Sequence, residues 1–298
     1  MKIIITLCLC IMSMFAKEIS PIKVLVSVLP QKEMIERIGG EYVKVEVLVP
    51  AGKSPEIYEP SIAQMRHIED SHIFFGVGMP FESAWLKRFK NTNPSLIYYN
   101  LADSFVDSKN TESQHTAHKH THNPHIWLSL KASILHTQII AQTLSKINKE
   151  QTAFFMQNAK LLESKLHSIQ KRTAHIFSLD TAQKSFIIYH PALKYWSEEF
   201  HIKELSLENE GKELKGRDLS ALIQEAKKQK IASIFIQPEF AKSRAKSFAN
   251  ELDLNIIELD VLRQDWLLSL QEIACQVAFS LSSTQSKSCV QAYFKDEL

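Results

Sequence analysis

Two series of alternating strand-like and helix-like segments flank a long stretch without any strand pattern, and this arrangement limits the chain to few folds. In the first series, short runs of branched apolar residues alternate with segments whose apolar residues recur at helical spacing. We predict strands at Ile22–Leu29, Val43–Val49, His72–Val77 and Leu96–Tyr99, and helices at Gln31–Ile38, Ser61–Asp70 and Phe81–Phe89.

The second series repeats this alternation. Its predicted strands are Phe186–Tyr189, Ile231–Ile236 and Asn255–Leu259, and its predicted helices are Ala192–Phe200, Asp218–Gln229, Lys242–Leu252 and Trp266–Leu281. Such alternation implies parallel sheets covered by helices. The segment Ser129–Phe177 has almost no glycine or proline and predicts one or two long helices.

The fold class that follows is α/β, with two lobes that each hold a mostly parallel sheet flanked by helices. A long helix bridges the lobes. We place an N-terminal lobe at 17–147, a linker helix at 148–177 and a C-terminal lobe at 178–298.

Composition excludes two classes of function. The 298 residues contain only 7 glycines, which leaves neither a phosphate-cradling loop nor a dinucleotide fingerprint. A net charge of +2, from 35 basic and 33 acidic residues, gives no basic field for nucleic acid. Five of the 12 histidines fall between His115 and His125, which points to metal.

The N-terminus has the pattern of a secretory signal peptide. Lys2 precedes an apolar run from Ile3 to Ala16, which is shorter than the roughly 20 residues that span a bilayer. We expect cleavage after Ala16, without a lipid-attachment box. A buried hydrophobic strand is the alternative. Cleavage leaves Cys275 and Cys289, which either form a disulfide in an oxidising compartment or remain partnerless.

The polar segment 104–123 interrupts the first lobe and predicts a mobile surface loop. Its histidines can bind metal weakly, because ordering a loop opposes affinity; they are His115, His118, His120 and His122. A merely solvated polar loop is the alternative. His125 differs, because it follows Pro124 and precedes the apolar pair at 126 and 127, which should hold its backbone in place.

Three further polar residues come just after predicted strands. His190 and Asp260 follow strands of the second lobe, and Glu56 lies shortly after Val43–Val49. Ligands of α/β sheets gather at the carboxyl ends of strands. Each residue alone could be an ordinary capping or surface group. Together with His125 they would make a four-ligand site for a divalent metal.

Several motifs, in this order and spacing, resemble the solute-binding proteins of bacterial ABC importers for zinc and manganese. The motifs are Gly52–Pro60, Gly76–Glu82, Asn123–Leu128, Tyr189–Ala192, Glu210–Glu213, Phe235–Phe240 and Glu258–Asp260, and the resemblance covers essentially the whole mature chain. It implies two α/β lobes bridged by a rigid helix, a metal held in the cleft between them, and delivery of that metal to a membrane permease.

The resemblance also implies a ligand set, with one ligand each at the positions of Glu56, His125, His190 and Asp260. A histidine-rich loop and a histidine at position 190 are typical of the zinc branch. The chain departs from the family at Glu56, where histidine is usual. A carboxylate can bind zinc, but it shifts the donor set towards oxygen and suits manganese better. Alternatively, His120 or His122 supplies the missing imidazole.

These observations favour an exported, periplasmic binding protein, monomeric and without enzymatic activity, that takes zinc or, alternatively, manganese or iron. A secreted zinc hydrolase would need an open coordination position and a general base. Glu239 is the carboxylate that could serve as that base, and no His-Glu-x-x-His motif is present. A surface adhesin is a third class, which no residue identifies.

Overall fold

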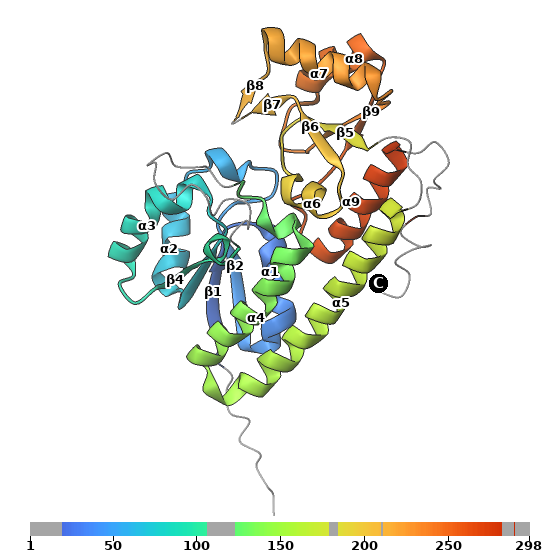
Figure 1. Ribbon diagram of the computed structural model, residues 1–298. Helices are drawn as coiled ribbons and strands as arrows, with labels where there is room; N and C mark the ends of the chain where they lie inside the picture. Colours follow the sequence, from blue (N-terminus) through green and yellow to red (C-terminus); the bar gives the residue numbers. More distant parts are fainter. Residues whose placement is uncertain (1–19, 106–122, 179–183, 210, 282–288, 290–298) are drawn as a thin grey trace, which may run out of the picture.

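A computed structural model of the protein describes residues 20–105, 123–178, 184–209, 211–281 and 289 (Figure 1). The predicted signal peptide and the histidines at 115, 118, 120 and 122 lie outside these residues. Within the described part of the chain, no helix is both long and apolar enough to cross a membrane.

The first sheet has four parallel strands in the order β2-β1-β3-β4. They are β1 (Ile22–Val26), β2 (Val43–Val47), β3 (Ile73–Gly76) and β4 (Ile97–Asn100). Figure 1 shows α2 (Ile62–Asp70) and α3 (Pro80–Thr92) on one side of this sheet and α1 (Leu29–Gly39) on the other. All four strands were predicted from their apolar runs, which suit strands covered on both faces.

The second sheet repeats the connectivity of the first. Its parallel strands β5 (Ser185–Ile188), β6 (Lys203–Ser206), β9 (Ser233–Ile236) and β10 (Asn255–Glu258) lie in the order β10-β9-β5-β6. Strand β6 was not predicted from the sequence. A short antiparallel hairpin of β7 (Glu208–Asn209) and β8 (Lys212–Glu213) was not predicted either.

Two long helices follow each other along the chain, after the last strand of the first sheet and before the first strand of the second. The segment predicted as one or two helices forms α4 (Leu130–Ile147) and α5 (Thr152–Ser178), with a 3-10 turn at Lys149–Gln151 between them. The Ser129 hydroxyl caps α4 by accepting a hydrogen bond from the Ala132 N–H. At 27 residues, α5 is about 40 Å long, and it runs alongside both lobes (Figure 1).

The hydrophobic core connects the two lobes. Ile187 and Tyr189 face a smaller core with α7 (Gly216–Lys228) and α8 (Lys242–Leu252). Their neighbours in β5, Phe186 and Ile188, face the main core. That core continues through α6 (Lys194–Glu199) and α9 (Trp266–Leu281) into the first lobe, where α9 packs against α1 and α5. The lobes therefore share buried apolar surface.

Two buried tryptophans strengthen this junction. The Trp127 indole N–H donates to the Val261 carbonyl at 2.9 Å, and the Trp266 indole N–H donates to the Trp127 carbonyl at 2.8 Å. Both side chains are almost fully buried. The loop after His125 is thereby held against the loop after β10.

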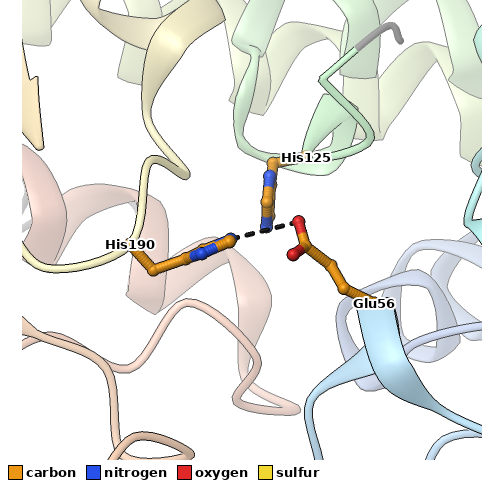
Figure 2. A group of neighbouring side chains, drawn as sticks. All are labelled: Glu56, His125 and His190. Atoms are coloured by element: carbon orange, nitrogen blue, oxygen red, sulfur yellow. Dashed lines mark hydrogen bonds and ion pairs between the residues drawn. The ribbon is translucent and has the colours of Figure 1, made fainter. Parts of the chain in front are cut away.

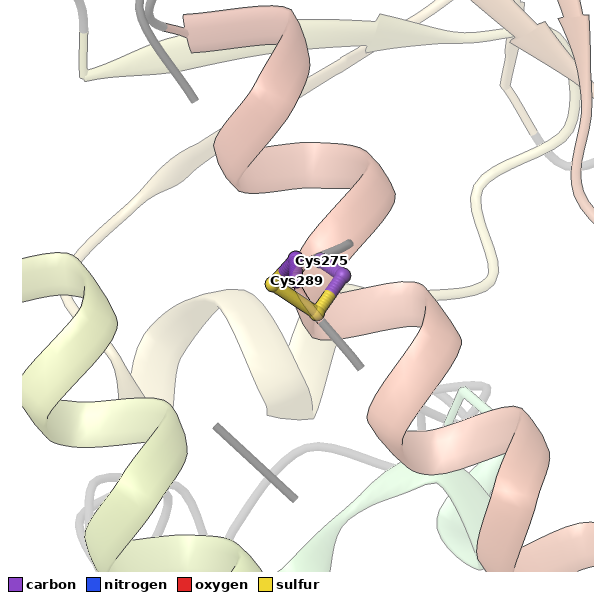
Figure 3. The surroundings of a disulfide bond; sticks show 2 residues. All are labelled: Cys275 and Cys289. Carbon is purple, nitrogen blue, oxygen red and sulfur yellow. A yellow bond between two sulfur atoms is a disulfide. The ribbon is translucent and has the colours of Figure 1, made fainter. Parts of the chain in front are cut away.

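A disulfide joins α9 to a residue beyond it. Cys275 and Cys289 are bonded, with their Cα atoms 5.7 Å apart (Figure 3). Closing this short loop of the chain restricts the unfolded state and stabilises the fold.

Candidate metal centre

Glu56 reaches the centre from the loop between β2 and α2. Pro55, Glu56 and Ile57 form a 3-10 turn, which Pro55 favours because its fixed φ suits a helical first position. Pro55 is buried, whereas the Glu56 side chain keeps 27% of its surface exposed. The turn thus anchors the backbone and leaves the carboxylate at the edge of the site.

His125 immediately precedes a 3-10 turn, Ile126–Leu128, whose side chains are buried. Its backbone N–H and its ring Nδ1 both lie within hydrogen-bond distance of the Asn123 Oδ1, at 3.0 and 2.7 Å. An amide oxygen only accepts, so Nδ1 carries the proton and Nε2 keeps its lone pair. His125 is 5% exposed, and its contacts with Asn123 orient the imidazole before any ligand binds.

His190 follows β5 and is held on three sides. The Gln237 side chain brackets its backbone by accepting from the N–H and donating to the carbonyl. The Phe240 ring stacks on the imidazole, with ring centroids 5.1 Å apart. The ring Nδ1 lies 2.9 Å from the buried Glu208 carboxylate. Nε2 is therefore the ring nitrogen directed to the centre.

These three side chains converge, although they come from different parts of the chain (Figure 2). Among the described residues, Glu56, His125 and His190 form a group in which one ligand atom of each lies within 4.8 Å of the others. The His190 Nε2 is 3.1 Å from the Glu56 Oε1. The carboxyl ends of the two sheets thus meet at this point, as expected for ligand sites of α/β folds.

The electrostatics of the centre differ between the two imidazoles. Burial, together with the charge of the neighbouring His190, lowers the pKa of His125 to about 3, although Glu56 acts in the opposite direction, so His125 is neutral at neutral pH. Burial also opposes charge on His190, but the carboxylates of Glu56 and Glu208 together raise its pKa. Burial tends to raise the pKa of Glu56, and the hydrogen bond and charge of His190 outweigh this and lower it.

Asp260 is not part of this group of three. It follows β10 as predicted, but it is exposed, and its Oδ1 accepts a hydrogen bond from the Leu262 N–H at 2.9 Å. Its carbonyl accepts from the Ser269 hydroxyl. Its role as a ligand stays a prediction.

Glu239 lies in the loop between Gln237 and Phe240 that holds His190. Burial raises its pKa to about 7, and the negative charges of Asp260 and Glu56 contribute. The Glu239 carboxyl group thus lies within electrostatic range of the centre and is only partly ionised near neutral pH. The site carries several negative groups around two imidazoles, which favours a divalent cation.

Sequence reasoning missed two residues of the centre, Asn123 and Glu208. Asn123 was read only as part of a motif, and the side-chain contact with His125 two residues later is a local signal that could have been used. Glu208 is 18 residues from His190 in sequence, in a polar stretch without a strand pattern, so no local signal marks it.

The fold and the centre together define a class: two-lobed α/β binding proteins with a histidine-carboxylate site where the lobes meet. A sequence model of the family described as zinc-uptake complex component A, periplasmic, matches residues 24–271. The chain belongs to this family, whose description is that of a component of an uptake complex.

The chain is also similar to individual metal-binding proteins in sequence and in structure. The zinc-binding lipoprotein AdcA of Streptococcus pneumoniae is 27% identical over 247 residues, 78% of this chain and 48% of AdcA. The chain thus spans about half the length of AdcA. The metal ABC transporter substrate-binding lipoprotein SsaB of Streptococcus sanguinis is 25% identical over 236 residues, 75% of this chain and 74% of SsaB. The crystal structure of ZnuA matches with a TM-score of 0.80 and 26% identity, covering 88% of this chain and 100% of that one.

Proposed function

We propose that this protein captures a divalent metal ion, in the first place zinc, outside the cytoplasm and delivers it to the membrane permease of an ABC importer. The observation that carries this proposal is the convergence of Glu56, His125 and His190. Because Asn123 and Glu208 already hold both imidazoles by Nδ1, little side-chain ordering opposes metal binding.

In this proposal, Glu56, His125 and His190 bind the metal, and Asp260 is the fourth ligand. The loop of Asp260 is fixed beside the loop of His125, since the Val261 carbonyl accepts from the Trp127 indole. Two carboxylates would give the set a formal charge of −2, which neutralises a divalent cation. The histidines at 115, 118, 120 and 122 would add weak sites.

Zinc suits the donor set best. Two imidazole nitrogens and carboxylate oxygens are ordinary zinc ligands at about 2.0–2.2 Å. The Irving–Williams order also favours zinc over manganese at any such site. AdcA is a zinc-binding relative by name, which supports the same choice. Glu56 is the residue that favours the second candidate, manganese, because a carboxylate replaces the usual imidazole.

The sequence supports an extracytoplasmic location, since residues 1–16 read as a signal peptide and the matched family is described as periplasmic. We propose a monomer in the periplasm, with lobes at 17–147 and 178–298 and the linker helix at 148–177. The relatives AdcA and SsaB are lipoproteins by name, so a membrane-anchored form is the alternative location.

The proposal is tested in two steps. Protein purified from its own periplasm, without added metal, should contain about one tightly held zinc per chain by elemental analysis. Cells in which the gene for this protein is deleted should take up radioactive zinc more slowly at low external zinc. Expression of the wild-type protein in these cells should restore uptake. Recovery of manganese or iron in place of zinc would replace the metal assignment. Unchanged uptake would contradict the delivery role.

A further inference from the structure

We propose that Glu208 is a positioning residue of the metal site, which acts through His190 by fixing the tautomer and orientation of its imidazole. This inference rests on the proposed function, because it concerns the ligand role of His190. Glu208 itself does not belong to the group of candidate ligands, which consists of Glu56, His125 and His190.

Glu208 is buried against the imidazole of His190. The Glu208 residue is only 4% exposed, and its Oε2 lies 2.9 Å from the His190 Nδ1. A buried carboxylate costs several kcal/mol in lost hydration unless a donor or a charge compensates it. His190 provides that compensation, so the contact is a constraint on both side chains rather than a passing surface interaction.

The contact between Glu208 and His190 also sets the direction of their hydrogen bond. An ionised carboxylate can only accept, so the Nδ1 of His190 must carry a hydrogen. The Nε2 then keeps its lone pair for a metal, or donates to the Glu56 Oε1 while no metal is bound. A carboxylate that accepts from the Nδ1 also makes the imidazole more basic, so its Nε2 lone pair binds metal more strongly. Losing such a partner typically costs 10–100-fold in metal affinity.

Backbone hydrogen bonds hold Glu208 beside the end of β5. Its N–H donates to the Tyr189 carbonyl, one residue before His190, and its carbonyl accepts from the Ser206 hydroxyl. The residue also begins β7, which pairs with β8. The carboxylate is therefore placed from the same strand end that carries the imidazole.

The chain provides a matched control in Glu213. It lies directly opposite Glu208 in the β7–β8 hairpin, and its Oε1 accepts from the Tyr189 hydroxyl at 2.7 Å. Both carboxylates thus hold neighbouring residues at the end of β5. In the part of the chain that the structure describes, Glu208 contacts the imidazole of His190, whereas Glu213 contacts the hydroxyl of Tyr189. Glu213→Gln removes the same charge from the same hairpin and leaves the His190 ring alone.

The experiment measures zinc affinity of the full chain by competition with a chromophoric chelator. We expect Glu208→Leu to weaken binding about 10–100-fold and Glu208→Gln, which keeps the shape but not the charge, to weaken it about tenfold. Glu213→Gln should stay within about twofold of the wild type. Thermal unfolding of each variant shows which are folded, and Glu208→Gln serves if the leucine variant does not fold.

A second readout separates positioning from a purely structural role. In nitrogen-15 spectra of histidine-labelled, zinc-free protein, the His190 Nδ1 should carry its proton in the wild type and in Glu213→Gln. In the Glu208 variants we expect a mixture of tautomers. If a folded Glu208 variant matches Glu213→Gln in both affinity and tautomer, the inference is overturned. A wild-type chain without tight zinc binding would overturn the proposed function itself, and the inference with it.

Discussion

The His190 Nε2 lies 3.1 Å from the Glu56 Oε1, although 134 residues separate the two in sequence. This contact joins the carboxyl ends of the two sheets at the centre that we assign to metal. It also gives a partner to the carboxylate at position 56, where the resemblance had implied a histidine.

Two substitutions of Glu56 should show how its charge and its donor atom each contribute to metal affinity. Glu56→Gln keeps the shape but removes the negative charge, so we expect affinity for every divalent metal to fall. Glu56→His should raise the preference for zinc over manganese, because nitrogen donors favour zinc. Chelator competition with both metals measures this. Glu59→Gln, which is exposed in the same loop, is the control. Zinc affinity of Glu56→Gln within about twofold of the wild type would exclude the carboxylate as a ligand.

Removing either imidazole should weaken zinc binding. His125→Ala and His190→Ala each delete one of the imidazoles that we propose as ligands, and we expect at least about a tenfold loss, or about 1.4 kcal/mol. Isothermal titration measures both. His167→Ala is the control, because its side chain is 56% exposed on α5 and pairs with Glu163. Wild-type affinity in one of the two variants would remove that histidine from the ligand set.

Deleting residues 114–122 should separate weak from tight binding. We expect the deletion to remove weak metal equivalents and to leave one tight equivalent, because imidazoles in a polar segment must be ordered before they bind. Competition with chelators of graded strength reports both classes. Loss of the tight equivalent would mean that a histidine of this segment is a ligand.

Glu204 on β6 should make the stability of the metal-free protein depend on pH. Both of its carboxyl oxygens are buried, and burial raises its pKa from 4.5 to about 8. Because the folded pKa lies above the unfolded one, this contribution to the free energy of unfolding is complete below about pH 4.5 and is lost as the pH rises towards 8. The slope is at most about 1.4 kcal/mol per pH unit.

Urea unfolding with a chelator present, between about pH 5 and pH 8, tests this dependence. Glu204→Gln cannot ionise, so its stability should fall less with pH than that of the wild type. Glu198→Gln, at an exposed position, should follow the wild type. Parallel curves for Glu204→Gln and the wild type would contradict the assignment.

Much of the fold could be predicted because central parallel strands are covered on both faces and read as continuous apolar runs. The edge strand β6 was missed, since Lys203, Glu204 and Ser206 give it a polar sequence. The hairpin was missed because each strand has two residues, which is too short for any periodicity. Tertiary pairing, rather than local preference, forms both elements.

The site was less accessible to local reasoning. The strand-end rule and the family resemblance together selected Glu56, His125 and His190, which the structure brings together. Neither predicts that Glu208 will be buried against His190, because that contact depends on how the hairpin folds back on β5. Asp260 shows the same limit, since a position at a strand end does not determine where the side chain points.

The most direct test of the central claim is anomalous diffraction at the zinc edge from crystals of the zinc-loaded protein. We expect one strong peak at about 2.0–2.2 Å from the His125 Nε2, the His190 Nε2 and a Glu56 carboxylate oxygen. The same map shows whether Asp260 completes the set. A strong zinc peak that touches neither histidine, or none between the lobes, would contradict the account.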